Sequence, residues 1–217
     1  MRRAEVHPFN ALAQRDDGDA ARYERLTLLG QGSTSTVYRA RRREDDRLFA
    51  YKLVKLAGFT EEQRADILNE VDVMTRVHHP NVVAYEESFV HADMLHIVME
   101  LLPGGDLAAE IESRTEQQAG NGSSSSTPSR STTSTTSPRS LDEEVIWSIL
   151  VQVCEGLEHM RSVRVLHRDI KAENIFSDGR GAVKIGDLGL GRLLSSRSTH
   201  ARTGVGTPLY FSPEMCE

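Results

Sequence analysis

The chain has 217 residues, of which 38% are hydrophobic and 27% are charged, and its formal net charge is −6. This length is ample for the core of one or two domains, and the acidic balance argues against a nucleic-acid-binding protein that works through bulk electrostatics. No segment approaches the run of about 18 apolar residues that a membrane-spanning helix needs. The two cysteines, Cys154 and Cys216, lack the spacing of a metal site. We therefore expect a cytoplasmic protein that binds neither nucleic acid nor membranes, with nuclear or cytoskeletal association left open.

The N-terminal half of the chain predicts an arm followed by a small β-rich lobe. Residues 1–22 are polar, and we interpret them as a disordered arm. Short apolar runs then predict strands near 26–29, 36–38, 48–54, 82–89 and 95–101. Thr60 and Gln63 have the spacing of a capping box, which opens one helix between the third and fourth of these strands. The expected buried face of this helix comprises Ile67, Val71, Met74 and Val77.

A polar insert and a long helix follow. Residues 120–140 are nearly all Ser, Thr, Gly, Asn and Pro, and we expect a disordered insert at about 115–140, because such a segment buries too little apolar surface to offset its ordering entropy. Ser140 and Glu143 form a second capping-box pattern. The apolar face of the helix comprises Ile146, Ile149, Val153, Leu157 and Met160. We expect Trp147 and Cys154 to pack in the core with this face.

A glycine-rich turn lies between the first two predicted strands. Gly30 and Gly32 allow backbone N–H groups to approach a phosphate without a Cβ in the way. Ser35 takes the third position of the G-x-G-x-x-G pattern, and its small side chain keeps clear of a nucleotide. Two glycines are also ordinary in a hairpin, so from this segment alone a simple turn and a nucleotide-binding loop both remain open.

Lys52 lies in a strand that is otherwise apolar. An unpaired charge in such a strand is costly, so Lys52 needs a partner. Ala50 shares its face and would present a small apolar surface to a base. The candidate partner is Glu70, on or beside the apolar face of the predicted helix, although a solvated Glu at the helix edge is the alternative interpretation.

Charged residues gather in two segments, at 165–174 and 183–189. Phosphoryl transfer needs a carboxylate to orient the attacking hydroxyl and oxygen ligands for the magnesium on the phosphates. Asp169, Asn174 and Asp187 are residues of these types. The apolar residues around them can bring them into one cleft.

Together these elements resemble the eukaryotic protein kinase family. The glycine turn, Ala-x-Lys at 50–52, the helix Glu, His-Arg-Asp-x-Lys-x-x-Asn at 167–174, Asp-x-Gly at 187–189 and Ser-Pro-Glu at 212–214 occur in the family's order and at similar spacing. The resemblance covers residues 23–217. It implies an α+β, bilobal fold, with a complete small β-rich N-lobe (about 23–101) that carries one regulatory helix, and an incomplete helical C-lobe (about 103–217). It further implies transfer of phosphate from ATP, with Mg²⁺, to Ser or Thr hydroxyls of protein substrates.

The resemblance also implies a role for each candidate residue. Asp169 would be the catalytic base, Lys171 would support the γ-phosphate, and Lys52 would hold the α- and β-phosphates while paired with Glu70. Asn174 and Asp187 would ligate magnesium. Met99 would be the gatekeeper residue before the hinge. The remaining residues expected to contact the nucleotide are Gly30, Gly32, Val37, Ala50, the hinge residues Glu100 and Leu102, and Asp106 near the ribose.

Within the family the chain resembles the NIMA-related kinases. Three features fit this group: Leu188, at a position where most kinases carry Phe; Ser35 in the glycine turn; and the segment 79–83. In such kinases the Arg of the catalytic loop, here Arg168, holds a phosphate on the activation segment and thereby orders it. We expect Thr203 to be the phosphorylated residue.

Two function hypotheses remain open at this point. The first is a protein Ser/Thr kinase of which this chain is the N-terminal part, because the family's later helices would follow Glu217. The second is a non-catalytic nucleotide-binding or interaction fragment. A small-molecule phosphotransferase explains the metal-binding Asp and Asn but not Ser-Pro-Glu. Without the later helices, the long helix is expected to expose apolar surface. The sequence identifies neither the protein substrate nor a regulatory partner.

Overall fold

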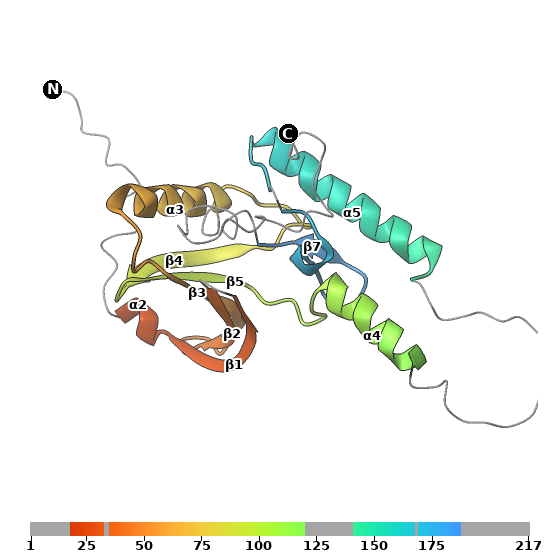
Figure 1. Ribbon diagram of the computed structural model, residues 1–217, viewed down its shortest axis with the longest axis horizontal. Coiled ribbons are helices and arrows are strands. Elements are labelled where there is room, and N and C mark those ends of the chain that lie inside the picture. The colour runs from red at the N-terminus through yellow and green to blue at the C-terminus, as the bar shows by residue number, and fades with distance from the viewer. Residues whose placement is uncertain (1–17, 33–34, 120–140, 168, 188–217) are drawn as a thin grey trace, which may run out of the picture.

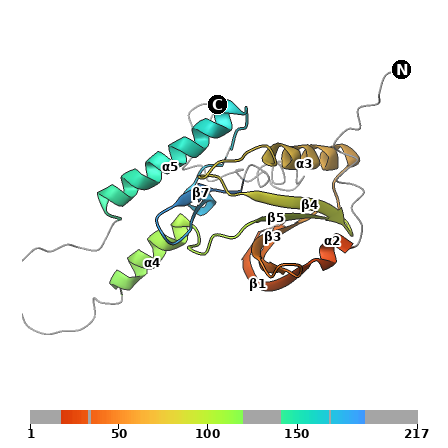
Figure 2. The same cartoon turned by 180° about the vertical axis from the view of Figure 1, so that it is seen from behind.

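The computed structural model describes residues 18–32, 35–119, 141–167 and 169–187 (Figure 1). The disorder predicted for 1–17 and 120–140 lies outside these residues. Within them, a β-sheet covered by α3 lies beside α4, α5 and a short hairpin (Figures 1 and 2). This confirms the predicted α+β fold with a β-rich N-lobe followed by a helical C-lobe. No helix of the described residues combines the length and the apolar character needed to cross a membrane.

The N-lobe contains a five-stranded antiparallel sheet with the strand order β1-β2-β3-β5-β4. The strands are β1 (Tyr23–Gln31), β2 (Ser35–Arg42), β3 (Leu48–Lys55), β4 (Tyr85–His91) and β5 (Met94–Glu100). Each of the predicted strands is present. β4 begins at Tyr85 rather than at residue 82, because Val82 forms a parallel bridge with Ile185 of the other lobe instead.

The helix α3 (Glu61–Met74) packs on one face of this sheet (Figure 1). Its capping box is confirmed, since the backbone N–H of Thr60 donates to Gln63 Oε1 at 2.9 Å and that of Gln63 donates to Thr60 Oγ1 at 3.3 Å. All four residues of its predicted buried face are buried. The core beneath α3 includes Val54, Leu56, Ile67, Leu68, Val71, Met74, Leu95 and Ile97. Burial of each such aliphatic side chain stabilises the fold by roughly 1.5–3 kcal/mol.

The C-lobe begins after β5 with α4 (Leu107–Ala119) and α5 (Glu143–Ser162). A 3₁₀ turn, η2 (Ala172–Asn174), leads into the hairpin of β6 (Ile175–Ser177) and β7 (Val183–Ile185). This hairpin packs against α5 through a small apolar core of Val153, Ile175, Val183 and Ile185. The core places β7 between α5 and the N-lobe (Figure 1).

Three predicted boundaries are wrong in detail. The arm predicted over 1–22 ends in a short helix, α2 (Gly18–Ala21), from which Ala20 packs on the sheet beside Tyr23. The insert predicted from about 115 begins later, because α4 continues to Ala119. The N-cap of α5 is Asp142 rather than Ser140, and it makes no side-chain capping hydrogen bond.

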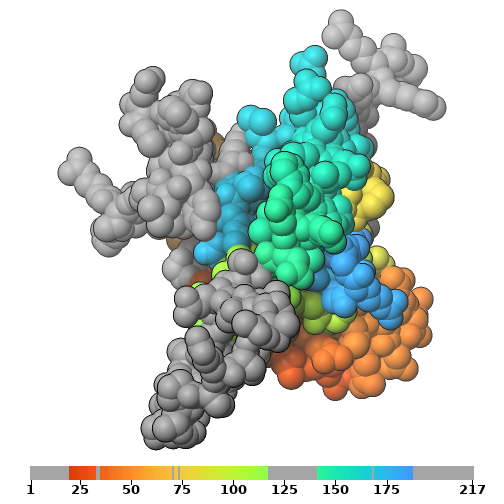
Figure 3. Space-filling model, turned by 90° about the vertical axis from the view of Figure 1, so that its right-hand side faces the viewer, coloured from red at the N-terminus to blue at the C-terminus, as the bar shows by residue number. Residues whose placement is uncertain are grey.

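One side of α5 is apolar and faces solvent, as expected for this helix. Trp147 is 57% exposed and Cys154 is exposed, so the prediction that these two residues pack in the core is wrong. The same surface carries Val145, Ile146, Leu150 and Val151. In the space-filling view α5 lies across the front of the molecule (Figure 3). Of the predicted apolar face, Val153 and Met160 are buried and Ile149 and Leu157 are partly buried, whereas the placement of Ile146 on the packed side is wrong.

Candidate active site

Lys52 and Asp187 form an ion pair that joins the two lobes. Lys52 lies in the middle of β3 and is only 4% exposed, so its ammonium group requires a partner. Its Nζ donates a hydrogen bond to Oδ1 of Asp187, two residues beyond β7. Burial by itself would raise the pKa of the Asp187 carboxyl, but the adjacent Lys52 ammonium outweighs this effect and holds the pKa below its ordinary value. Asp187 is therefore a carboxylate at neutral pH.

The pairing of Lys52 with Glu70 stays a prediction. Glu70 belongs to α3, but its side chain lies outside the described part of the structure, as does the whole of Arg168. Thr203 and Leu188 fall within residues 188–217, which are also outside it. The expected roles of these residues in pairing and phosphate recognition therefore rest on the family resemblance.

The backbone at Asp187 has an unusual conformation that its neighbours hold in place. Its φ is +58°, in the left-handed region that costs a residue with a Cβ about 1–3 kcal/mol. The preceding N–H, of Gly186, donates to the carbonyl oxygen of Asn174 at 2.9 Å. A Cβ added at Gly186 would lie 2.8 Å from a ring carbon of Phe176 and 2.9 Å from Val83 Cγ2. Only glycine fits there, so the segment entering Asp187 is tightly enclosed.

Asp169, Lys171 and Asn174 form a second polar cluster. The Asn174 Nδ2 donates to the backbone oxygen of Asp169 at 2.7 Å and to its Oδ2 at 3.1 Å. The Lys171 Nζ lies 3.3 Å from the same Oδ2. Asn174 is buried, whereas Asp169 and Lys171 are partly exposed. The structure therefore brings together three residues that the sequence predicted to act together, with Asp169 partly exposed to solvent.

His167 connects the two clusters, and the sequence analysis assigned it no role. Its Nδ1 accepts the backbone N–H of Asp169 at 3.3 Å, so its Nε2 carries the proton and donates to the Gly186 oxygen at 2.8 Å. Burial lowers the pKa of His167 and keeps the ring neutral. The imidazole thus ties the backbone before Asp187 to the backbone of Asp169. The available signal was its place in the catalytic-loop motif, two residues before Asp169.

The expected hinge residues lie between the lobes. Glu100 ends β5, and its backbone N–H donates to the Ala84 oxygen at 2.8 Å. Its carboxylate accepts two hydrogen bonds from Lys184 of β7, at 2.8 and 2.7 Å. Lys184 is a second residue that the sequence analysis missed, although a lysine between the apolar Val183 and Ile185 was a visible signal. This pair holds the end of β5 against β7.

Leu102 and Asp106 follow in the connection to α4. Leu102 is partly buried, and its carbonyl oxygen accepts the N–H of Gly105 at 3.5 Å. Asp106 Oδ1 accepts the backbone N–H of Ala109 at 2.8 Å, so this carboxylate caps the first turn of α4. A contact between Asp106 and a ribose remains a prediction.

The glycine turn lies at the end of β1. Gly30 pairs with Val37 across the β1–β2 ladder, and the N–H of Gly32 donates to the Ser35 oxygen at 2.8 Å. Residues 33 and 34 at its tip lie outside the described part. On β3, Ala50 is next to Met99 in register and two residues from Lys52. These positions fit the expected order of glycine turn, base-facing alanine and phosphate-facing lysine.

The donor atoms of the two clusters fit magnesium. Mg²⁺ prefers hard oxygen ligands and is usually held by one or two carboxylates together with substrate phosphates. In Asp187, Lys52 bonds Oδ1, so Oδ2 is the carboxylate oxygen that would bind a metal. In Asn174, the amide nitrogen donates to Asp169, so the amide oxygen would be the metal ligand. Asp187 and Asn174 are thus suited to a magnesium–nucleotide complex.

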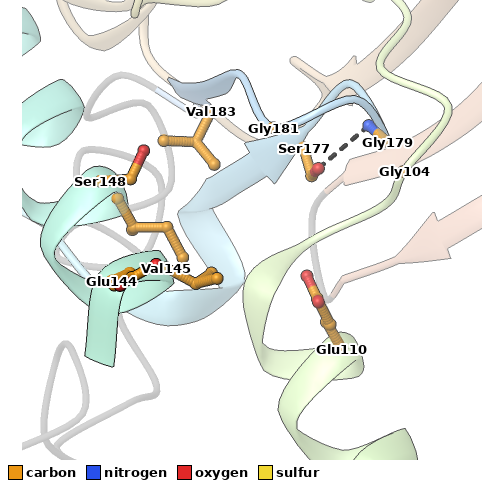
Figure 4. A pocket seen from close by; sticks show the side chains of 10 residues that line it. Gly104, Glu110, Glu144, Val145, Ser148, Ser177, Gly179, Gly181 and Val183 are labelled. Atoms are coloured by element: carbon orange, nitrogen blue, oxygen red, sulfur yellow. Dashed lines mark hydrogen bonds between the residues drawn. The ribbon is translucent and has the colours of Figure 1, made fainter. Parts of the chain in front are cut away.

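A separate cavity of about 490 Å³ lies beside the β6–β7 hairpin (Figure 4). It is bordered by α4, the first turns of α5 and the β6–β7 hairpin, and the residues that line it are Gly104, Glu110, Glu144, Val145, Ser148, Ile149, Ser177, Gly179, Gly181 and Val183. None of the predicted site residues lines it. The polar clusters around Lys52, Asp169 and Asp187, rather than this cavity, have the groups needed for chemistry.

Comparison with known proteins agrees with the geometry. The family model for the protein kinase domain matches residues 23–217. The chain is 35% identical to mouse serine/threonine-protein kinase Nek1 over 196 residues, 36% identical to zebrafish serine/threonine-protein kinase Nek8 over 197 residues, and 34% identical to human serine/threonine-protein kinase Nek2 over 200 residues. These alignments cover 90%, 90% and 89% of this chain but only 14%, 25% and 40% of the respective relatives. The chain belongs to the protein kinase family, and its relatives confirm the predicted resemblance to the NIMA-related Ser/Thr kinases.

Proposed function

We propose that the chain transfers the γ-phosphate of ATP, in a magnesium-dependent reaction, to Ser or Thr hydroxyls of protein substrates. The observation that carries this proposal is the convergence of Lys52, Asp169, Asn174 and Asp187 from three separate segments of the chain, which are β3, the segment 169–174 and the end of β7. Each is supported by hydrogen bonds of the described structure. The names of the relatives support Ser and Thr as acceptors.

Asp169 would act as the base that orients the acceptor hydroxyl and takes its proton. Two donors, Asn174 Nδ2 and Lys171 Nζ, face its Oδ2 and hold the carboxylate in one orientation. Lys171, whose Nζ lies 3.3 Å from Asp169 Oδ2, would stabilise negative charge on the phosphoryl group that is being transferred. Positioning and electrostatic stabilisation of this kind account for most of the catalysis expected in phosphoryl transfer.

Lys52, Asp187 and Asn174 would bind the phosphates and their metal. The Lys52 ammonium would bind the α- and β-phosphates, while Asn174 and Asp187 would hold Mg²⁺. When bound, magnesium neutralises the charge of the phosphate oxygens. The adenine would lie between Ala50 and the hinge backbone at Glu100 and Leu102. Gly30, Gly32 and Val37 would cover the nucleotide.

Phosphate transfer to a generic protein substrate tests the proposal directly. With Mg-ATP we expect activity from the wild-type chain and a loss of about 10²–10⁴-fold in Asp169→Asn, because asparagine cannot accept the proton. Glu173→Gln is the matched control, since Glu173 is exposed and adjacent to Asn174. Equal activity of Asp169→Asn and wild type would refute the role of Asp169. A wild-type chain that binds Mg-ADP but transfers no phosphate would instead be a nucleotide-binding module.

Activation by phosphorylation is part of the same proposal. A phosphate on Thr203 would pair with Arg168 and order the activation segment beside Asp169. We expect Thr203→Ala to lower the activity of phosphorylated protein to that of dephosphorylated protein. Full activity of Thr203→Ala, or mapping of the activating phosphate to another residue, would contradict this assignment.

A further inference from the structure

Two side-chain amides join three segments of the chain behind Asp187. Asn81 lies in the connection between α3 and β4 and is buried, and Gln152 lies on α5. The Asn81 Nδ2 donates to Gln152 Oε1 at 3.0 Å and to the carbonyl oxygen of Val183 at 3.0 Å. The N-lobe connection, α5 and the beginning of β7 therefore meet at these two amides.

The amide of Gln152 pairs with the backbone of the hairpin. Its Oε1 accepts the N–H of Val183 at 2.9 Å as well as Asn81 Nδ2, and its Nε2 donates to the carbonyl oxygen of Gly181 at 3.0 Å. Both the donor and the acceptor side of this amide are thus used. Ser148, one turn earlier on α5, lies beside Gly181 and Val183 in the cavity wall (Figure 4) and also accepts from Nε2 at 3.2 Å.

The backbone of the N-lobe connection extends the same junction. The N–H of Ile185 donates to the Asn81 oxygen at 2.9 Å, and the N–H of Val83 donates to the Ile185 oxygen at 2.8 Å. A Cβ at Gly156 of α5 would lie 2.9 Å from the Asn81 oxygen, so the helix approaches this carbonyl closely. β7 is therefore bonded on one side by residues 81–83 and at its beginning by Gln152.

This support matters because the hairpin is very small. β6 and β7 have three residues each, and an isolated two-stranded hairpin of this kind is marginal in water. Asp187 follows β7 by two residues and has a left-handed backbone that its surroundings must maintain. A displacement of β7 would therefore move the carboxylate away from Lys52.

We propose that Gln152 and Asn81 are positioning residues, which act through β7 to place the Asp187 carboxylate for magnesium. This inference rests on the proposed function, in which Asp187 holds the metal. Neither amide carries out chemistry. Loss of the Gln152 amide would leave Asn81 Nδ2, the Val183 N–H and the Gly181 carbonyl each without one partner, and β7 would no longer be held in one position.

Binding of ADP to the full chain, with and without Mg²⁺, tests the proposal. Gln152→Met keeps the side-chain length without the amide, and Gln152→Glu keeps the acceptor but loses the donor. Glu155→Gln is the matched control, because Glu155 is an exposed residue of the same helix. For Gln152→Met we expect metal-free ADP affinity within about twofold of wild type, while the gain in affinity from Mg²⁺ falls about tenfold, the loss typical of residues that support metal ligands. The gain in affinity of Gln152→Glu should lie between those of wild type and Gln152→Met, and that of Glu155→Gln should match wild type.

Amide hydrogen exchange gives a readout that does not depend on nucleotide. We expect faster exchange of the Val183 and Ile185 N–H groups in Gln152→Met than in wild type and Glu155→Gln, while amides of the β3–β5 ladder are unchanged. An unchanged magnesium gain together with unchanged exchange of β7 would overturn the proposal, as would equal loss of metal-free and magnesium-dependent affinity. If wild type binds no ADP, the proposed nucleotide site is wrong, and the exchange experiment alone decides whether Gln152 positions β7.

Discussion

Replacement of Lys52 by methionine separates the effect of burial on Asp187 from the effect of its ion pair. Methionine keeps the apolar stem of the side chain but removes the ammonium. Asp187 then loses the largest influence that lowers its pKa, and burial is left as the dominant effect. We expect the pKa of Asp187 to rise and the variant to be less stable than wild type at neutral pH, because a carboxylate in a largely enclosed position has lost its partner.

The magnitude follows from the exposure of the two side chains. Removal of one partner from a fully buried ion pair costs about 3–5 kcal/mol, whereas exposed pairs contribute about 0–1 kcal/mol. The Lys52 side chain is 6% exposed but that of Asp187 is 39% exposed, so solvent screens part of the interaction. We therefore expect Lys52→Met to lower the free energy of unfolding by roughly 2 kcal/mol, between these limits.

The pH dependence has a definite sign. In wild type the folded pKa of Asp187 is lowered, so the stabilisation from the pair is complete above the unfolded value of about 3.9 and is lost as the pH falls through the folded pKa. In Lys52→Met the folded pKa is raised, so protonation on acidification relieves the unpaired charge. The stability difference between the two proteins should thus be largest near neutral pH and shrink toward pH values of about 4.

Urea unfolding of wild type, Lys52→Met, Asp187→Asn and the double variant measures this coupling. Lys55→Met is the matched control, because Lys55 is an exposed lysine at the end of the same strand. The double variant should recover part of the loss, since an uncharged asparagine side chain in place of Asp187 needs no cation. The reasoning is refuted if Lys52→Met is no more destabilising than Lys55→Met, or if the effects of the two single variants add without coupling.

Three further outcomes follow from the structure. Burial lowers the pKa values of His96 and His167, so both rings are held neutral in the folded protein. The free energy of unfolding should therefore be highest above the pKa of about 6.5 of an unfolded histidine, and should fall on acidification by up to about 1.4 kcal/mol per pH unit for each ring. Urea unfolding between pH values of about 7.5 and 5.5 should show this slope, and the slope should be smaller in His96→Gln. In Gly104→Ala the added Cβ would lie 2.7 Å from backbone atoms of the hairpin. We expect urea unfolding to show that this variant has a free energy of unfolding about 1–3 kcal/mol below that of wild type. Gly30→Ala, where no atom lies within 4 Å of the added Cβ, should have a free energy of unfolding within about 0.5 kcal/mol of wild type. Equal effects of the two substitutions would contradict the packing argument. Trp147→Gln should change stability by less than about 0.5 kcal/mol and reduce binding of a hydrophobic dye, because the indole is exposed on α5, and a large loss of stability would show that the indole is buried in solution.

Local sequence patterns predicted the elements of the N-lobe well. The apolar runs predicted the strands. The Thr60–Gln63 pattern predicted the start of α3 correctly, because a capping box depends only on residues three positions apart. The same pattern failed at Ser140. There the helix begins at Glu143 and its N-cap is Asp142. The three-residue spacing between Ser140 and Glu143 could not reveal which of the neighbouring polar residues is the N-cap.

Helical periodicity indicated which side of α5 is inward but not how much of the helix is covered. Val153 and Met160 are buried as expected, whereas Trp147 and Cys154 face solvent. Burial depends on which other elements of the described structure lie against the helix, and here these are the hairpin and residues 79–83. Residue type alone does not contain that information.

By itself the sequence determined the identity of the chemical groups: a lysine in an apolar strand, an Asp and an Asn in one loop, and an Asp after a short strand. Motif order then placed them in a known family. Only the tertiary structure decided that Lys52 bonds Asp187, that His167 ties the two acidic residues together, and that Gln152 and Asn81 support β7. These contacts join residues up to 135 positions apart, and a hydrogen bond between distant segments depends on the packing of everything between them, which no local spacing records.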